Sequence, residues 1–336
     1  MRAMVLAAGL GTRLRPITNG MPKPMVPVLN RPVMEHIVRL LAGNGLTEAI
    51  ANLHWFPETI EGHFGDGSDF GIELSYSREE KLLGTSGGVR NAAGFLGDSF
   101  LVISGDALTD IDLRAMAEFH GSHDGIATLA TKRVADTSQF GVAITGEDGR
   151  IQGFQEKPPA AEALSDLANC GIYMFRSAIF DFFPEPGTSR AASEGDPPGF
   201  ADWAMDVFPA LLEADVPFYS HEIDRYWNDI GNLDELRQGN VDALLGEVAV
   251  EPGADRVSDR IWSATALEGA EVSGPALLGT GVELGAGARL EGPAVVGDGC
   301  RIGAGAVVRD AILIEGAEVP PRGMLVGGIA ARIASA

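Results

Sequence analysis

Up to about residue 245, the chain alternates short apolar runs with amphipathic stretches. Short runs rich in β-branched and aliphatic residues predict strands, whereas apolar positions repeated every three or four residues predict helices. Strands are therefore predicted at Met4–Ala8, Ala49–Leu53, Phe100–Ser104 and Ile126–Thr131, and helices at Val33–Ala42 and Leu113–His120. This alternation is typical of an α/β domain with a mostly parallel sheet.

Strands are predicted to follow one another more closely later in the same region, at Val142–Ile144, Ile151–Gln155 and Gly171–Phe175. Because helices no longer separate them, we expect a mixed sheet or an inserted β-rich subdomain here. Pro184–Gly199 is rich in Pro, Gly and Ser, which predicts an exposed loop.

Beyond about residue 246 the pattern changes to a six-residue period. Aliphatic residues occupy eight successive positions of this period, namely Val272, Leu278, Leu284, Leu290, Val296, Ile302, Val308 and Ile314. A period of six suits a β-helix, in which each hexapeptide forms one flat side of a coil. Cys300 occupies a position where the repeat favours a small inward side chain. We therefore predict an α/β domain over residues 1–245, a linker over 246–265 and a repeat domain over 266–336.

Charge and composition exclude several classes of partner. The formal net charge of −22 would repel nucleic-acid backbones and anionic membranes, so neither is expected to bind. No apolar run approaches the roughly 18 residues that span a bilayer, and the first apolar run fits a buried strand better than a signal peptide. Cys170 and Cys300 lie far apart in sequence, so neither a disulfide framework nor a zinc site is predicted. The cytoplasm is the expected compartment.

Phosphate-binding chemistry is concentrated just after the first predicted strand. Gly9 and Gly11 form a glycine turn there, and Arg13 and then Lys23, held between two prolines, follow. Glycines at such a turn let backbone N–H groups face a phosphate chain, and the two cations can neutralise it. The segment is not a dinucleotide fingerprint, because Arg13 replaces the third glycine, and it lacks the Gly-Lys-Ser/Thr of a P-loop.

The N-terminal sequence LAAGLGTRLRPIT…PKPMVPV resembles the signature of the sugar-phosphate nucleotidyltransferase family. The resemblance extends to about residue 240, through the ordered segments EEKLLGTSGG, ISGDAL, FGVA, FQEKP, NCGIYMF and YWNDIGN. A six-residue β-helix behind the catalytic domain is also typical of this family. The resemblance implies a Rossmann-like mixed-sheet nucleotidyltransferase domain followed by a left-handed parallel β-helix of hexapeptide repeats. Within the family, the chain is most similar to the mannose-1-phosphate guanylyltransferases.

The resemblance also implies how a nucleoside triphosphate binds. The base and ribose are expected to lie beside Leu6, Ala7, Ala8, Gly9, Gly84 and Thr85. The triphosphate is expected at Gly11, Thr12 and Arg13, with Lys23 reaching the phosphates at the reacting centre. Asp106 follows the strand Phe100–Ser104, at an end of the sheet where ligands of open α/β folds collect.

Asp106 and Asp229 match the two metal-binding carboxylates of the family, and Mg²⁺ prefers such a pair together with phosphate oxygens. The sugar 1-phosphate is expected at Gly141, Glu156, Lys157, Asn169 and Gly171. Glu156 can accept hydrogen bonds from sugar hydroxyls, and Lys157 can pair with the sugar's phosphate. Arg13, Lys23, Asp106, Lys157 and Asp229 are the predicted catalytic residues.

Several alternatives remain open at this point. Family members often carry Thr or Gln where this chain has Asn232, and Asn where it has Ala107, which leaves the substrate undecided. GTP with mannose 1-phosphate is favoured, and thymidylyl, uridylyl or adenylyl transfer to glucose 1-phosphate is the alternative. A non-catalytic regulatory subunit is disfavoured because all five predicted catalytic residues are present. An acyltransferase role of the repeats is disfavoured because no histidine follows His221. The open ends and flat sides of a β-helix need covering, so we expect a homo-oligomer.

Overall fold

The computed structural model describes residues 1–332 of the chain, which divides into two compact units. The first unit comprises Met1–Leu10, Ile37–Ala107 and Ile111–Trp227. The second comprises Gly11–His36, Leu108–Asp110 and the chain from Asn228 onward. Each unit is described by itself below.

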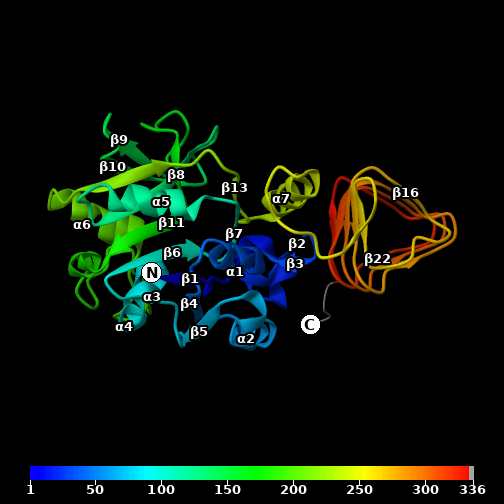
Figure 1. Ribbon diagram of the computed structural model, residues 1–336, viewed down its shortest axis with the longest axis horizontal. Helices are drawn as coiled ribbons and strands as arrows, with labels where there is room; N and C mark the ends of the chain where they lie inside the picture. The colour runs from blue at the N-terminus through cyan, green and yellow to red at the C-terminus, as the bar shows by residue number, and fades with distance from the viewer. Residues whose placement is uncertain (333–336) are drawn as a thin grey trace. The chain divides into compact units, whose positions relative to one another are not determined.

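A nine-stranded mixed sheet forms the centre of the first unit (Figure 1). Its strands are β1 (Arg2–Leu6), β4 (Glu48–Leu53), β5 (Glu73–Arg78), β6 (Ser99–Ser104), β8 (Ala127–Arg133), β9 (Gly141–Thr145), β10 (Ile151–Glu156), β11 (Leu167–Arg176) and β12 (Phe218–Glu222). The main path runs β10-β9-β11-β6-β1-β4-β5, and β8 pairs with both β11 and β12. Strands β6, β1, β4 and β5 are mutually parallel, whereas β11 runs antiparallel to β6, β8 and β9. The predicted mixed sheet is confirmed.

The helices before β12 are α1 (Val33–Gly43), α2 (Pro57–Phe64), α3 (Gly84–Asn91), α4 (Ala93–Leu96), α5 (Leu113–Gly121) and α6 (Phe208–Glu213), with a π-helical turn at Trp203–Val207. The two predicted helices correspond to α1 and α5. Helix α5 begins where the Asp112 carboxylate accepts hydrogen bonds from the backbone N–H groups of Arg114 and Ala115. Residues 184–199 form no helix or strand and are mostly exposed, as predicted.

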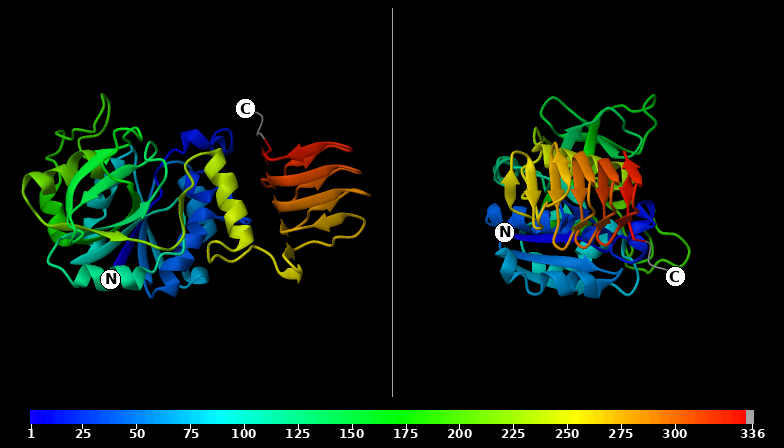
Figure 2. Two further views of the ribbon diagram at one scale, coloured as in Figure 1. Left: turned by 90° about the horizontal axis from the view of Figure 1, so that it is seen from above. Right: turned by 90° about the vertical axis from the view of Figure 1, so that its right-hand side faces the viewer.

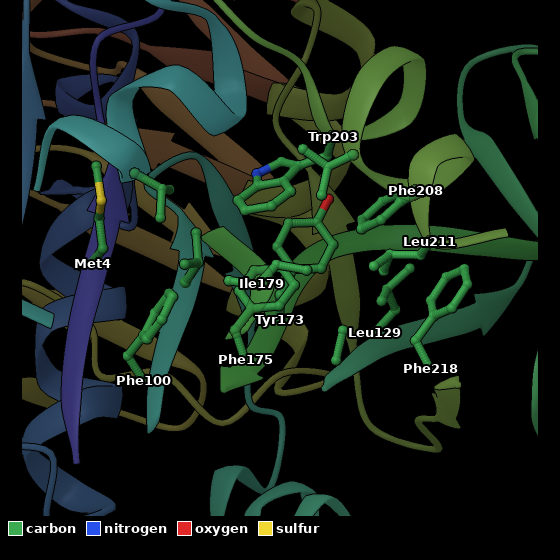
Figure 3. Packing of buried hydrophobic residues seen from close by; sticks show 14 of the residues in the cluster. Met4, Phe100, Leu129, Tyr173, Phe175, Ile179, Trp203, Phe208, Leu211 and Phe218 are labelled. Atoms are coloured by element: carbon green, nitrogen blue, oxygen red, sulfur yellow. The ribbon is translucent and has the colours of Figure 1, made fainter. Parts of the chain in front are cut away.

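Aromatic side chains fill the core of the first unit on one face of the sheet (Figure 3). Phe100 and Phe175 project from neighbouring strands with ring centroids 5.7 Å apart, and Trp203 stacks on Phe175 at 4.6 Å. Phe208 from α6 and Phe218 from β12 extend the same cluster. Burying an aromatic side chain of this size contributes roughly 2–3 kcal/mol. This packing fixes β6, whose end carries a predicted catalytic residue.

The second unit joins short N-terminal elements to the repeats. It contains β2 (Pro27–Val28), β3 (Arg31–Pro32), β7 (Ala107–Thr109), β13 (Trp227–Asp229), α7 (Leu233–Leu245), β14 (Arg256–Ser258), β15 (Ile261–Ser263), β16 (Glu271–Ser273), β17 (Ala276–Leu278), β18 (Glu283–Leu284), β19 (Arg289–Val296), β20 (Arg301–Ile302), β21 (Val307–Leu313), β22 (Glu318–Val319), β23 (Met324–Val326) and β24 (Ile329–Ala330). β14 and β15 lie inside the segment predicted as a linker, and β15 pairs with β17 of the repeats.

The repeats form a parallel β-helix, seen nearly end-on in Figure 1 and from the side in Figure 2. Arg289 pairs with Val307, which occupies the same place three hexapeptides later, so three hexapeptides make one coil. Cys300 lies fully buried in the inward core, as predicted. The predicted fold class is confirmed.

The six-residue period does not hold throughout the repeats. Ala294 pairs with Ala311 rather than with the residue after it, because the chain loses one position of the period beside Asp310. Leu313 therefore occupies the inward position, and Ile314 lies outside the core cluster. Asp310 has a left-handed φ of 49°, which lets the backbone turn within this shortened side.

Helix α7 contacts β2, β19 and β21 within the second unit. Asn240, fully buried on this helix, accepts a hydrogen bond from the Leu29 N–H at 2.9 Å. Its amide donates to the carbonyl of Pro27 at 3.2 Å. One side chain thus satisfies backbone groups of a segment near the other end of the chain.

Replacing Asn240 by Leu should lower the free energy of unfolding by about 2–3 kcal/mol, because the buried Leu29 N–H and the half-buried Pro27 carbonyl lose their partner. Urea denaturation measures this change. Gln238→Leu, at an exposed position of the same helix, is the control and should change stability by less than about 0.5 kcal/mol. Equal effects of the two substitutions would contradict the role of Asn240.

Candidate functional site

The carboxyl ends of β1 and β6 form one edge of the first unit's sheet. Because the two strands are parallel, Ala7 and Asp106 both emerge at this edge. The Gly105 N–H donates to the carbonyl of Leu6 at 2.9 Å, which ties the two chain segments together. A Cβ at Gly105 would lie 3.0 Å from that same carbonyl oxygen, so glycine permits the close approach. Asp106 is half-buried here.

Gly84 and Thr85 begin α3, and the segment around Ala201 covers this end of the helix. The carbonyl of Ala201 accepts hydrogen bonds from the N–H groups of Ser86 and Gly87, both at 3.1 Å. Gly84 has a φ of 74°, and a Cβ there would lie 2.3 Å from the same carbonyl oxygen. The N–H groups of Ser86 and Gly87 in the first turn of α3 are therefore used within the protein rather than directed at a phosphate.

The Thr85 hydroxyl is held by residues that the sequence did not single out. It donates to the Asp202 carboxylate at 2.7 Å and accepts from the Trp203 N–H at 3.1 Å. Asp206, itself buried, accepts from the Asp202 N–H at 2.9 Å and from the Ser189 hydroxyl at 2.7 Å. Two carboxylates thus fix the segment that covers α3.

A second set of residues absent from the sequence prediction lies beneath the same edge. Asn52 is the penultimate residue of β4 and accepts a hydrogen bond from the Ala7 N–H at 2.8 Å. Its amide donates to the Glu79 carboxylate at 2.8 Å. A single Asn within a predicted apolar strand has no distinguishing pattern, and Glu79 is only the first residue of the quoted segment EEKLLGTSGG.

On the predicted sugar side, Gly141 and Glu156 are paired neighbours on β9 and β10. A Cβ at Gly141 would lie 2.9 Å from the Glu156 carboxylate. Lys157 forms an ion pair with Glu156 at 3.1 Å, and both side chains are exposed. The structure therefore brings a cation and a carboxylate together at the end of β10, where an anionic, hydroxyl-rich ligand could contact both.

Asn169 and Gly171 lie on β11, where the register with β8 is interrupted. The Asn169 amide donates to the Tyr173 hydroxyl at 2.9 Å, and its oxygen accepts from the Gly171 N–H at 3.2 Å. Gly171 has a φ of 69°, and a Cβ there would lie 2.6 Å from the Ser104 hydroxyl oxygen. Burial raises the pKa of Tyr173, so it remains a neutral partner for the amide.

In the second unit, Gly11, Thr12 and Arg13 form a tight turn. Gly11 has a φ of 62°, and its carbonyl accepts from the Thr18 hydroxyl at 2.7 Å. Thr12 and Arg13 are exposed on a single 3-10 turn, while Leu14 is buried beneath them. The Thr12 hydroxyl and the Arg13 guanidinium are thus exposed, while the buried Leu14 side chain holds the turn in place.

Lys23, Asp229 and Arg13 lie together in this unit. The Lys23 ammonium is 3.5 Å from the Asp229 carboxylate, and their side chains are 12% and 31% exposed. A Cβ at Gly231 would lie 3.2 Å from the Arg13 guanidinium and 3.3 Å from the Asp229 carboxylate, so Gly231 leaves room for both. Asn232, one of the departures from the family pattern, accepts from the Glu235 N–H and begins α7.

The predicted residues thus fall into two sets, one in each unit. Gly11, Thr12, Arg13, Lys23 and Asp229 belong to the second unit, and the other predicted site residues belong to the first. Within residues 1–332, no group of three His, Cys, Asp or Glu side chains is arranged as a metal cage.

His120, His123, His221 and both cysteines are at least partly buried. Burial lowers the pKa of His120 to about 4, so this ring is neutral at pH 7. Burial also lowers the pKa of His123 and His221. Cys170 and Cys300 are buried free thiols, and burial raises the pKa of both. No helix within residues 1–332 is both long enough and apolar enough to cross a membrane.

Residues 2–245 match the nucleotidyl transferase family, and residues 275–310 match the bacterial transferase hexapeptide repeats. The chain is 36% identical to the UTP–glucose-1-phosphate uridylyltransferase of Synechocystis sp., over 97% of this chain and 86% of the relative. It is also 36% identical to the mannose-1-phosphate guanylyltransferase of Mycobacterium tuberculosis, over 85% of this chain and 77% of the relative.

Among solved structures, the chain is similar to a Bacillus anthracis protein assigned as a glucose-1-phosphate thymidylyltransferase, solved in complex with a sucrose. The TM-score is 0.64 at 26% identity, covering 75% of this chain and 97% of that one. The family match extends from residue 2 to residue 245, and both the mixed sheet and the coils are present. The chain therefore belongs to the sugar-phosphate nucleotidyltransferase family and carries a C-terminal hexapeptide-repeat β-helix.

Proposed function

We propose that this chain transfers the nucleotidyl group of GTP to mannose 1-phosphate, forming a nucleoside-diphosphate sugar and releasing pyrophosphate. The observation that carries this proposal is the group of Arg13, Lys23 and Asp229, two cations around one carboxylate. The 36% identity to a mannose-1-phosphate guanylyltransferase over 85% of the chain supports the substrate pair.

The presence of glycine at position 9 is evidence that a nucleotide binds at the end of β1. The φ of Gly9 is not left-handed, the residue is exposed, and a Cβ there would meet nothing within 4 Å. Neither conformation nor packing within the protein therefore requires glycine at this position. Close approach of the backbone to a ligand is the remaining physical reason for it.

In the proposed reaction, a phosphate oxygen of the sugar 1-phosphate attacks the α-phosphorus of the nucleoside triphosphate. A new phosphorus–oxygen bond forms as the bond to the leaving pyrophosphate breaks on the opposite side. Arg13 and Lys23 hold the triphosphate and offset its charge, while Lys157 holds the sugar phosphate and Glu156 accepts from sugar hydroxyls. The attacking phosphate is already ionised at neutral pH, so the neutral buried histidines are not needed as bases.

Asp106 and Asp229 are the proposed Mg²⁺ ligands. Both are half-buried carboxylates, and hard oxygen donors with the substrate's phosphates suit this ion. When bound, Mg²⁺ would neutralise charge that develops on the phosphate oxygens. Asp229 would have two roles, because its carboxylate also lies 3.5 Å from the Lys23 ammonium.

UTP with glucose 1-phosphate is the second candidate pair. The Synechocystis uridylyltransferase matches 97% of this chain at the same identity as the guanylyltransferase. Residues common to the two reactions, such as Lys23 and Asp106, cannot distinguish them, because they act on phosphates rather than on the base or sugar.

A matrix of nucleoside triphosphates against sugar 1-phosphates, followed by pyrophosphate release, tests the substrate proposal. GTP with mannose 1-phosphate should give the highest kcat/KM. Another pair that turns over about tenfold faster, equivalent to roughly 1.4 kcal/mol of transition-state binding, would replace it. No pyrophosphate release with any pair would favour a non-catalytic subunit.

Asp106→Asn and Asp229→Asn should each lower turnover by on the order of a hundredfold at saturating Mg²⁺, because each removes a charged ligand. Initial rates across a magnesium titration measure the effect. Asp98→Asn removes an equal charge at an exposed position and should leave the rate unchanged. Near-normal activity of either test variant would exclude that residue from the metal site.

Gly11→Ala should reduce both stability and turnover. The added Cβ would lie 2.9 Å from the Cβ of Lys23 at a φ of 62°, so it strains the turn and displaces the lysine. We expect a loss of about 1–3 kcal/mol in urea denaturation and a lower kcat. Gly20→Ala lies in the same segment, where a Cβ meets nothing within 4 Å and φ is −120°, and should change neither. A fully active Gly11→Ala variant would show that Lys23 need not occupy this position.

A further inference from the structure

Asn52 and Glu79 form a buried polar pair beneath the carboxyl edge of the first unit's sheet. Their residues are 3% and 6% exposed, respectively. Asn52 lies near the end of β4, opposite Leu6 of β1, and Glu79 follows directly after β5. The Glu79 N–H donates to the carbonyl of Leu53 at 2.7 Å, which fixes its backbone to β4.

The pair connects two chain segments through a continuous series of hydrogen bonds. The Ala7 N–H donates to the Asn52 side-chain oxygen at 2.8 Å, and the Asn52 amide donates to Glu79 Oε1 at 2.8 Å. At the other end, the Leu83 N–H donates to Glu79 Oε2 at 3.0 Å. Ala7 belongs to the segment after β1, and Leu83 immediately precedes Gly84 and α3.

The backbone at both ends determines the direction of the two outer hydrogen bonds in this series, whereas the two side chains set the direction of the central one. Backbone N–H groups can only donate, so the series needs two acceptors at its ends and one donor–acceptor contact at its centre. An amide at position 52 and a carboxylate at position 79 meet this requirement. Burial raises the pKa of Glu79, while hydrogen bonds from Asn52 and Leu83 act in the opposite direction.

Helix α3 packs directly against the pair. A Cβ at Gly88 would lie 2.7 Å from the Asn52 amide nitrogen and 2.8 Å from Glu79 Oε1. A side chain at this position would therefore push into the central hydrogen bond. Close packing against Asn52 and Glu79 thus explains why position 88, the last of the segment GTSGG, is a glycine.

We propose that Asn52 and Glu79 are positioning residues that set the separation between the Ala7 and Leu83–Thr85 segments, and hence the shape of the nucleotide site. This inference rests on the proposed function, in which these two segments border the base and ribose. Neither side chain needs to touch the substrate. Their effect should therefore appear in nucleotide recognition rather than in sugar-phosphate recognition.

Reversing the polarity of the pair tests this proposal. In Glu79→Gln, one end of the new amide opposes an N–H group, and in Asn52→Asp two carboxylates face each other. In the double variant N52D/E79Q, the new carboxylate accepts from the Ala7 N–H and from the new amide, whose oxygen accepts from the Leu83 N–H. Every hydrogen bond is then possible again, with the central one reversed.

Each single variant should raise the KM for the nucleoside triphosphate about tenfold and change the KM for the sugar 1-phosphate less than about twofold. In the double variant, the KM for the nucleoside triphosphate should return most of the way to the wild-type value. Pyrophosphate release with the best substrate pair gives these constants, and titration calorimetry with the same triphosphate measures binding directly. Glu80→Gln removes a charge from the exposed neighbour and serves as the matched control, with no expected change.

A double variant no better than the weaker single, or equal changes in both KM values, would overturn the positioning role. Circular dichroism and thermal unfolding identify variants that fail to fold, and Gly88→Ala then provides a second route, since it should also raise the nucleotide KM selectively. A wild-type chain that releases no pyrophosphate with any pair would overturn the proposed function together with this inference. An active wild type with unchanged single variants would overturn this inference alone.

Discussion

The parallel alignment of β6, β1, β4 and β5 is the constraint on which the rest of the first unit depends. Parallel strands end at a common edge, so the segments that follow them must share limited space there. Strands β6, β1 and β4 are paired on both sides within the sheet, which leaves their backbones little freedom to adjust. Polar side chains at the strand ends, among them Asn52 and Glu79, therefore decide how the loops above them are arranged.

Much of this architecture could be predicted from the sequence because strong periodic patterns produce it. Apolar runs such as Phe100–Ser104 became strands, and the six-residue repeat became coils. The hydrophobic period predicts the inward positions less well where a coil is one residue shorter than the coil before it. The aliphatic residue at 314 continues the period, but backbone pairing follows the shortened turn at Asp310 and selects Leu313 instead. Hydrophobicity cannot distinguish two adjacent aliphatic residues, whereas the stacking of coils can.

The site was predicted less completely than the fold. Charged residues in recognisable motifs, such as Lys23 and Asp229, were found by resemblance, and the structure pairs them. Residues that support a motif through hydrogen bonds, without belonging to a motif themselves, have no comparable sequence pattern. Asp202 and Asp206 follow a stretch predicted only as an exposed loop, yet their carboxylates fix the segment that covers α3. Their importance comes from partners far away in sequence, which a single chain does not reveal.

The coil length of the β-helix limits how its size can change during evolution. Between Val272 and Val308 the inward positions return to the same side after three complete hexapeptides. Duplication of a complete coil would preserve every stacking contact, whereas duplication of a single hexapeptide would rotate all later residues onto the next side. Across Asp310 the return interval is shorter by one position, as in the pairing of Val308 with Leu325. A complete coil copied from either part would still return the chain to the same side, so either part can lengthen by whole coils, and the one-residue difference would stay confined to the corner that Asp310 occupies.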